Sequence, residues 1–397
     1  MSIRFAVEVV FWLSALALFY TFAGYPLLLF VISHLRPARV QRAQITPAVT
    51  LIITAYNEER DLAAKLENTL ALDYPRDLLE IIVASDCSTD GTDEIARNFV
   101  DRGVRLIRQP ERLGKVAAQN AAVAQACGEV ILFSDATTMY NPDVVRAIVP
   151  GFADKSVGCV GGRLVYVDGS DSSIGHGARS YWSYESRLRT YESRIWSLIG
   201  TAGCLYAVRR SAFVPLYHEA GSDFVISLEM IKQGLRTIYE PQAVCTAETN
   251  RKVEAEMKMR VRLIAHTFAD LWRYRAMLNP FRYGFFAVQL LSHKLMRYFV
   301  PFFLIALLGA SATLAPVSFF YRILLVGQIV GYAGATAAWW LGRLGLHSRV
   351  LAIPQYFLLA NIAALMACYR FLRGERFARW EPIREPTVQT VASPEAP

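Results

Sequence analysis

The sequence of 397 residues lacks several patterns that would define a function directly. Its six cysteines are scattered along the chain with no close pair, so neither a zinc spacing nor a disulfide framework is indicated. No GxGxxG follows the first predicted strand, and no GxxxxGK[ST] is present, which argues against a dinucleotide site and a P-loop. Unpaired cysteines fit a reducing cytoplasm.

Charge and apolar residues are unevenly distributed. Hydrophobic residues make up 54% of the chain and concentrate at its two ends, while the net charge is +8. Much of the positive charge flanks the apolar ends, at Arg36, Arg39, Arg42, Arg370, Arg373, Arg376 and Arg379. This placement favours contact with a membrane surface and argues against a nucleic-acid partner.

The N-terminal residues 1–36 are predicted to form a transmembrane anchor. The apolar run from about Phe5 to His34 exceeds the roughly 20 residues that span a bilayer as a helix. Basic residues follow the run immediately, so the region after it is predicted to be cytoplasmic.

Further membrane helices are predicted in residues 298–372, over about Tyr298–Phe320, Ile323–Leu341 and Val350–Tyr369. Residues 276–297 mix apolar and basic side chains and predict an amphipathic helix at the interface. Residues 373–397 read as a basic and polar tail. Four spans would place this tail outside, against the positive-inside tendency. Either one segment is re-entrant or that tendency does not hold here.

Residues 47–275 read as a soluble α/β domain. Short β-branched runs predict strands at Val49–Thr54, Leu79–Ser85, Val104–Arg108 and Val130–Ser134. Helical patterns alternate with these runs, which predicts an open parallel sheet with helices on both faces.

Four acidic residues follow the ends of predicted strands: Glu58, Asp86, Asp90 and Asp135. Ligands of such sheets bind outside the carboxyl ends of the strands, so a shared site is predicted there. Carboxylates suit a divalent cation that neutralises a diphosphate, and Lys115 could add positive charge beside it. Taken singly, Asp86 could instead close a turn and Asp90 could cap the next helix.

Seven motifs occur in a characteristic order: VTLIITAYNEE, IIVASDCSTDGT, RLGKVAAQNAAV, VILFSDATTMYNPD, GTAGCLYAVRR, SDFVISLEMIKQGLRTIYEP and MRVRL. Over about Ala48–Phe268 the chain resembles the family 2 glycosyltransferases with a GT-A fold, especially the membrane-embedded branch of cellulose and hyaluronan synthases. The resemblance implies a Rossmann-like GT-A domain attached to transmembrane helices.

The resemblance also implies roles for matching residues. The donor site would contain Thr54, Ala55, Glu58, Asp86, Asp90, Lys115, Ser134, Arg260 and Arg262, with Asp86 on the uracil of a UDP-sugar. Asp135 would bind Mg²⁺ or Mn²⁺, although Thr137 replaces the usual second carboxylate of that motif. Asp223 would be the general base, and capping of its own helix is the alternative interpretation.

Two regions carry interpretations that stay open at this stage. An acceptor would bind near Gly203, Trp182 and Tyr184, yet the aromatic side chains suit packing equally well. MRVRL stands where processive members carry Gln-x-x-Arg-Trp, and only Arg262 of that pattern remains. In the alternative interpretation, Arg260 and Arg262 belong to a solvent-exposed basic surface and bind no ligand.

The sequence therefore predicts an inverting glycosyltransferase of a bacterial inner membrane, with a cytoplasmic catalytic domain. It would transfer a sugar from a nucleotide-sugar to a lipid-linked or polysaccharide acceptor for cell-surface polysaccharide synthesis. Membrane lipids and other polysaccharide-synthesis proteins are further expected partners. The alternatives are a processive synthase, or a transporter or scaffold component with a nucleotide-binding domain.

Overall fold

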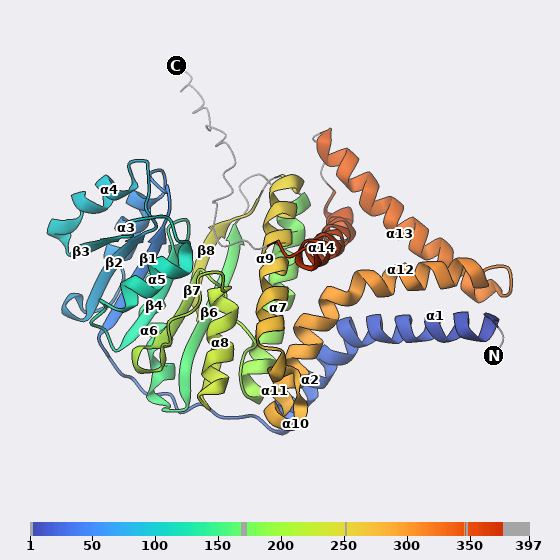
Figure 1. The fold of residues 1–397 in the computed structure, drawn as a ribbon, viewed down its shortest axis with the longest axis horizontal. Helices are drawn as coiled ribbons and strands as arrows, with labels where there is room; N and C mark the ends of the chain where they lie inside the picture. Colours follow the sequence, from blue (N-terminus) through green and yellow to red (C-terminus); the bar gives the residue numbers. More distant parts are fainter. Residues whose placement is uncertain (1–2, 168–172, 251, 345, 347, 376–397) are drawn as a thin grey trace, which may run out of the picture.

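The computed structural model describes residues 3–167, 173–250, 252–344, 346 and 348–375. Most of the predicted basic tail, including Arg376 and Arg379, lies outside the described residues. Figure 1 shows a mixed sheet with its covering helices on the left and long apolar helices on the right.

The described strands form one eight-stranded sheet in the order β3-β2-β1-β4-β7-β6-β8-β5. The strands are β1 (Val49–Ala55), β2 (Leu79–Ser85), β3 (Val104–Arg108), β4 (Val130–Asp135), β5 (Met139–Tyr140), β6 (Val157–Val167), β7 (Leu205–Arg209) and β8 (Arg236–Glu248). The four predicted strands are confirmed and pair in parallel. The remaining strands make the sheet mixed, because β7 runs antiparallel to both β4 and β6.

Helices cover both faces of this sheet. The covering helices are α3 (Leu62–Leu70), α4 (Thr92–Asn98), α5 (Lys115–Val123), α6 (Val144–Ile148), α7 (Ser173–Ile195) and α8 (Ser222–Lys232). Side chains of α5 and α8 pack with Ile52 and Phe133 on one face. Those of α3, α4 and α6 pack with Leu51 and Leu132 on the other. Alternate strand residues point to opposite faces, which explains why adjacent positions join different cores.

Helices α7 and α9 (Val253–Arg273) stand between the sheet and the apolar helices (Figure 1). The apolar part comprises α1 (Ile3–Phe19), α2 (Tyr25–Leu35), α10 (Pro280–Tyr283), α11 (Phe285–Gln289), α12 (Met296–Leu314), α13 (Phe319–Arg343) and α14 (Arg349–Leu372). Phe11 of α1 packs against Ala310 and Leu314 of α12, and these two helices extend together away from the sheet (Figure 1).

Four helical segments of the described chain are long and apolar enough to cross a membrane: Ile3–Leu35, Phe285–Leu314, Phe319–Gly342 and Arg349–Leu372. The second joins α11 and α12 through a π-helical turn at Leu290–Leu295. It therefore begins inside the stretch predicted as an interfacial helix, and a boundary at residue 297 stays a prediction.

A buried polar network joins these helices to α7. His293 contacts both Glu185 (Nε2 to Oε1 3.1 Å) and Glu192 (Nδ1 to Oε1 2.6 Å). Tyr25 donates to Glu192 at 2.7 Å, and Arg297 pairs with Glu185 at 2.9 Å. Since buried charges persist only when they are paired, these contacts fix α2 and the Phe285–Leu314 segment against α7.

Candidate active site

The carboxyl ends of β1, β2 and β4 meet at one edge of the sheet. Thr54 of β1 stands opposite Ala84 of β2 and Asp135 of β4 in register. Register partners share a face of the sheet, so Thr54 and Asp135 lie on the side covered by α5. Thr54 is buried, and its hydroxyl has no hydrogen-bond partner among the described residues. A polar ligand at this edge could supply that partner.

Lys115 and Asp135 form an ion pair at this edge. Lys115 is the first residue of α5, and its Nζ donates to Oδ1 of Asp135. Burial alone would lower the pKa of Lys115, but the charges of Asp135 and Asp223 raise it above its ordinary value. The structure thus gathers one charged ammonium and two carboxylates from three separate motifs.

Asp223 lies in the first turn of α8, beside the loop that carries Gly203. The backbone N–H of Thr201 donates to the carbonyl oxygen of Asp223 at 2.9 Å, and the Thr201 hydroxyl donates at 3.1 Å. A Cβ placed on Gly203 would lie 3.5 Å from Cγ of Asp223. The glycine therefore faces the carboxylate directly, and any larger residue would occupy the space beside it.

Asp86 holds the loop that leads to Lys115. Its Oδ1 accepts from the N–H groups of Leu113 (2.9 Å) and Gly114 (3.0 Å), and its Oδ2 accepts from Gly114 at 2.9 Å. Gly114 has a φ of 99°, a conformation that favours glycine. Asp86 thus positions the start of α5, whereas its predicted contact with uracil stays a prediction.

Asp90 bonds to the first residue of α4, while the N-cap position itself is Gly91. Its Oδ1 accepts from the backbone N–H of Thr92 at 3.0 Å, which satisfies a donor at the helix start. Its Oδ2 accepts from the N–H of Glu59 at 3.3 Å. The N–H of Glu58 in turn donates to the Thr92 hydroxyl at 2.7 Å. These bonds tie the loop after β1 to the loop after β2, and direct donor contacts of Glu58 and Asp90 stay predictions.

Ala55 and Ser134 are buried within their strands. The carbonyl of Ala55 accepts from the N–H of Asp86 at 2.9 Å, so it belongs to the same strand edge. Ser134 precedes Asp135, and its side chain points to the opposite face of the strand. The structure therefore does not bring the Ser134 hydroxyl beside the Asp135 carboxylate.

The two arginines of MRVRL occupy different environments. Arg260 pairs with Glu256 at 2.9 Å and with the Tyr356 hydroxyl, and its guanidinium lies 4.9 Å from the Tyr181 ring centroid. Arg260 thus joins α9 to α7 and α14, away from the Lys115–Asp135 pair.

Arg262 lies one helical turn before His266 in α9, so the two side chains are neighbours on this helix. Burial lowers the pKa of His266, and the Arg262 charge lowers it further while Asp223 opposes the change. The ring nitrogen Nδ1 of His266 lies 3.2 Å from the carbonyl oxygen of Glu219. The predicted contact of Arg262 with a diphosphate stays a prediction.

The predicted acceptor aromatics point in different directions. Trp182 packs against the sheet, with its ring centroid 5.8 Å from that of Tyr166 in β6. Tyr184 packs in the cluster of Tyr25 and Leu29 from α2. Two positions along a helix point to nearly opposite sides, so the structure does not bring both rings to Gly203.

The structure also reveals Lys65, which the sequence analysis did not identify. This lysine of α3 is fully buried, and its Nζ lies 3.6 Å from the centroid of the Tyr140 ring. Burial lowers the pKa of Lys65 to about 7, and the nearby Asp135 charge opposes this effect only in part. On the opposite face of the sheet from Lys115, it is a second basic group beneath the end of β4.

A second group missed by the sequence analysis is Asp270, eight residues after Arg262. Asp270 is fully buried, and its carboxylate accepts from the Tyr217 hydroxyl and from the N–H of Gly221 at 3.1 Å. These bonds hold the segment that precedes Asp223. Burial raises the pKa of Asp270 to about 7, although both donors oppose the rise.

An Asp270→Asn variant is expected to change how stability depends on pH. An unfolded aspartate has a pKa of about 3.9, so between about pH 4 and pH 7 only the folded chain holds this proton. Wild-type stability therefore falls across this window, by on the order of a few kcal/mol from this group. Thermal unfolding at pH 5 and pH 7 should show a weaker dependence in the variant. An unchanged dependence would contradict the assignment, and Asp73→Asn, an exposed carboxylate, is the matched control.

No cluster of three or more metal-binding side chains occurs in the described part of the chain. Asp135 offers one partly exposed carboxylate at the strand edge, with only one oxygen bonded to Lys115. Mg²⁺ and Mn²⁺ are often held by one or two carboxylates plus phosphate oxygens and water. The residues present therefore fit a metal that arrives with a diphosphate.

Two cavities lie elsewhere on the described surface. One of about 270 Å³ is lined by residues of α2 and α7. Another, of about 860 Å³, lies between the end of α8 and residues 273–283. Neither is lined by Lys115, Asp135 or Asp223, so the candidate active site is defined by its side chains and its strand edge.

Residues 50–215 match the family model "Glycosyl transferase family 2". This match supports a family 2 glycosyltransferase domain over these residues, and it agrees with the mixed sheet and the charged edge described above. The match supports the predicted enzyme class. The narrower resemblance to the cellulose and hyaluronan synthase branch stays a prediction.

Curated relatives carry the name N-acetylglucosaminyltransferase. The protein from Mesorhizobium japonicum is 27% identical over 241 residues, which cover 56% of this chain and 57% of that protein. The one from Rhizobium meliloti is 28% identical over 240 residues, which cover 56% of each chain. The match thus spans a little over half the length of these relatives.

Among solved structures, the chain is similar to the mannosyltransferase PcManGT from Pyrobaculum calidifontis, in complex with GDP-Man and Mn²⁺. The TM-score is 0.70 at 22% identity, and the match covers 93% of this chain and 100% of that one. This likeness confirms the predicted fold class of a GT-A domain with attached helices.

Proposed function

We propose that this protein transfers a sugar, with inversion, from a nucleotide-sugar donor to a glycan or lipid-linked acceptor at a membrane surface. The observation that carries the proposal is the convergence of Lys115, Asp135 and Asp223 at the carboxyl edge of the sheet. Each comes from a different motif, and together they supply a cation for phosphates, a metal ligand and a carboxylate base.

Asp223 is the proposed general base. Its carboxylate accepts the proton of the acceptor hydroxyl while the acceptor oxygen bonds to the anomeric carbon. The nucleoside diphosphate leaves from the opposite side of that carbon, which inverts its configuration. Gly203 leaves room for the acceptor beside the carboxylate, because a Cβ there would stand 3.5 Å from Cγ of Asp223.

Lys115 and Arg262 are proposed to bind the diphosphate. Fixed positive charges stabilise the negative charge that develops on a leaving phosphate. Asp135 would hold the divalent metal, which supplies Lewis-acid neutralisation of the same phosphates. In the described structure Lys115 pairs with Asp135, so donor binding would exchange this ion pair for contacts with phosphate oxygens.

The donor is proposed to be a UDP-sugar, with UDP-N-acetylglucosamine as the first to test. The relatives named N-acetylglucosaminyltransferase support this choice of sugar. The similar archaeal structure contains GDP-Man, which makes GDP-mannose the most informative second donor. Met259 and Leu263 stand where processive members carry Gln and Trp around the arginine. This difference favours addition of a single sugar over long-chain synthesis.

The catalytic domain is proposed to face the cytoplasm of a bacterial plasma membrane. Basic residues directly follow the first membrane helix, which supports this orientation by the positive-inside tendency. The four apolar helices support attachment to the bilayer, where a lipid-linked acceptor would be accessible.

A donor screen tests the proposed function and its metal requirement. The full chain in membranes is expected to release UDP from UDP-N-acetylglucosamine with Mn²⁺ or Mg²⁺, and to lose at least about 10²-fold in rate with EDTA. Re-adding metal should restore the rate. Undiminished turnover in EDTA would contradict the role of Asp135. Turnover of GDP-mannose alone would contradict the UDP-sugar, and a ladder of long products would contradict single addition.

A further inference from the structure

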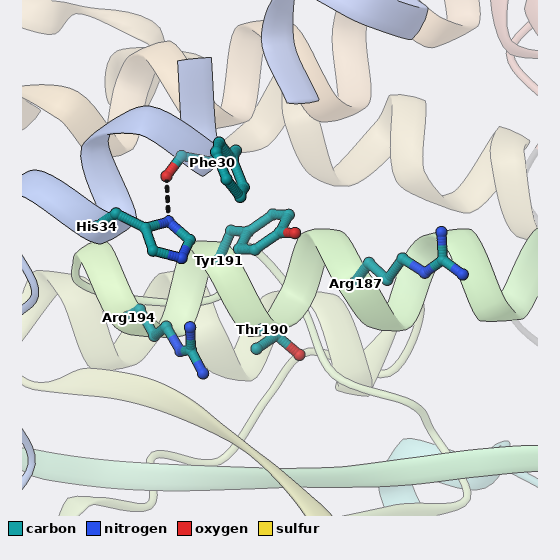
Figure 2. Close-up of a pocket in the computed structure, with 6 residues that line it drawn as sticks. All are labelled: Phe30, His34, Arg187, Thr190, Tyr191 and Arg194. Carbon is teal, nitrogen blue, oxygen red and sulfur yellow. Dashed lines mark hydrogen bonds between the residues drawn. The ribbon is translucent and has the colours of Figure 1, made fainter. Parts of the chain in front are cut away.

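A basic cavity lies where the first apolar helix ends on α7. Figure 2 shows Arg187 and Arg194 along α7, with Thr190 and Tyr191 between them, and His34 and Phe30 of α2 facing this stretch. The cavity has a volume of about 270 Å³. This size suits a small charged group and is smaller than typical drug-sized pockets.

The side chains that line this cavity are either basic or uncharged. None of its lining residues is acidic. Within the described part of the chain, neither Arg187 nor Arg194 forms an ion pair with a carboxylate. Elsewhere on the same helix Arg189 pairs with Glu185 at 3.5 Å, so α7 does contain acids that pair with arginines. Two guanidinium groups without a carboxylate partner leave their donors available to an external anion.

The neighbouring surface is apolar and belongs to a membrane helix. Leu27 is 61% exposed, Phe30 45% and Val31 41%, all on α2. The Ile3–Leu35 segment contains 33 residues and is about 50 Å long, whereas a hydrocarbon core is about 30 Å thick. Arg36 and Arg39 directly follow this segment, so the surplus length at its basic end extends into the headgroup region and brings the cavity to the level of lipid phosphates.

The rim of the cavity is held in place by ring contacts. The Phe30 ring meets the Tyr191 ring edge-on, with centroids 5.8 Å apart. Nδ1 of His34 lies 2.7 Å from the carbonyl oxygen of Phe30 (Figure 2). These contacts fix the end of α2 against α7, so the cationic side chains and the exposed apolar face form one continuous surface.

We propose that this cavity binds the phosphate headgroup of an anionic phospholipid. Arg187 and Arg194 contact the phosphate oxygens, and the hydroxyls of Thr190 and Tyr191 are available as further donors. The acyl chains lie along the exposed face of Leu27, Phe30 and Val31. This site is separate from the Lys115–Asp135 edge and does not depend on the proposed transfer reaction.

The full chain in neutral detergent tests the proposal by native mass spectrometry. It is titrated with phosphatidylglycerol, with phosphatidylcholine of the same acyl chains, and with inorganic phosphate. Phosphatidylglycerol is expected to bind, and the R187Q/R194Q variant to bind it roughly 25-fold more weakly, at about fivefold for each charge removed. The R36Q/R39Q variant removes the same charge near the same membrane surface but outside the cavity, and should retain wild-type binding.

The outcomes separate the alternatives. Equal weakening in both double variants would show general attraction to the surface and overturn the proposal, as would equal binding of phosphatidylcholine. Inorganic phosphate that binds as tightly as phosphatidylglycerol would overturn a lipid as the source of the anion. Should R187Q/R194Q fail to fold, the single variants Arg187→Gln and Arg194→Gln carry the test, each with about a fivefold loss.

Discussion

An Asp223→Asn variant is expected to lose about 10²–10⁴-fold in kcat while donor binding is retained. Asparagine keeps the shape of the side chain but cannot accept the proton of the acceptor hydroxyl. The backbone bonds from Thr201 to the Asp223 carbonyl do not involve the carboxylate, so they are expected to persist. The measurement compares single-turnover transfer with the dissociation constant of the donor.

The matched control is Asp73→Asn, which removes an exposed carboxylate paired only with Arg146. This variant should transfer sugar at the wild-type rate. A wild-type rate in Asp223→Asn would remove the base from the proposed function and leave helix capping as its role. A loss confined to donor affinity would instead place Asp223 in the donor site.

An Asp135→Ala variant is expected to reduce transfer by at least about 10²–10³-fold, because the diphosphate loses its metal-binding carboxylate. The change also removes the ion-pair partner of Lys115, leaving a partly buried ammonium without its carboxylate. Added Mn²⁺ should therefore fail to restore the rate. The measurement is the transfer rate as a function of metal concentration.

A Thr137→Asp variant tests whether Asp135 is the only acidic metal ligand of its motif. Thr137 is exposed two residues after Asp135, where a second carboxylate usually stands in the resembling family. If Asp135 is the only acidic ligand of its motif, Thr137→Asp should raise apparent metal affinity while activity is retained. Activity in Asp135→Ala at saturating metal would show that the metal is held by other groups.

The sequence predicted the first half of the sheet closely. β2 and β3 begin and end at the predicted residues, and β1 and β4 each extend one residue further. β1, β2 and β4 are buried on both faces, so their β-branched runs stand out from the surrounding pattern, whereas β3 is the partly exposed edge strand. The later strands β5–β8 include antiparallel partners distant in sequence, and periodicity alone does not reveal such pairings.

The candidate site was predictable where strand ends define it. Asp86 and Asp135 follow β2 and end β4, and topology alone brings them to one edge. The placement of Arg260 was not predictable, because its partner Tyr356 lies 96 residues away in the chain. Asp270 was missed for a similar reason, since its role depends on Tyr217 and Gly221, which approach only in the folded chain.

A chain of contacts through α7 links the Asp223 backbone to a membrane helix. His293 of a membrane helix contacts Glu185, which pairs with Arg189 at 3.5 Å. Arg189 donates to the carbonyl of Thr201 at 3.3 Å, and the Thr201 N–H holds the carbonyl of Asp223 at 2.9 Å. Membrane helices tilt when the thickness of the hydrocarbon layer changes. A tilt of the helix that carries His293 would therefore be transmitted along these contacts to the segment that holds Asp223, which makes bilayer thickness a variable to control when the transfer rate is measured.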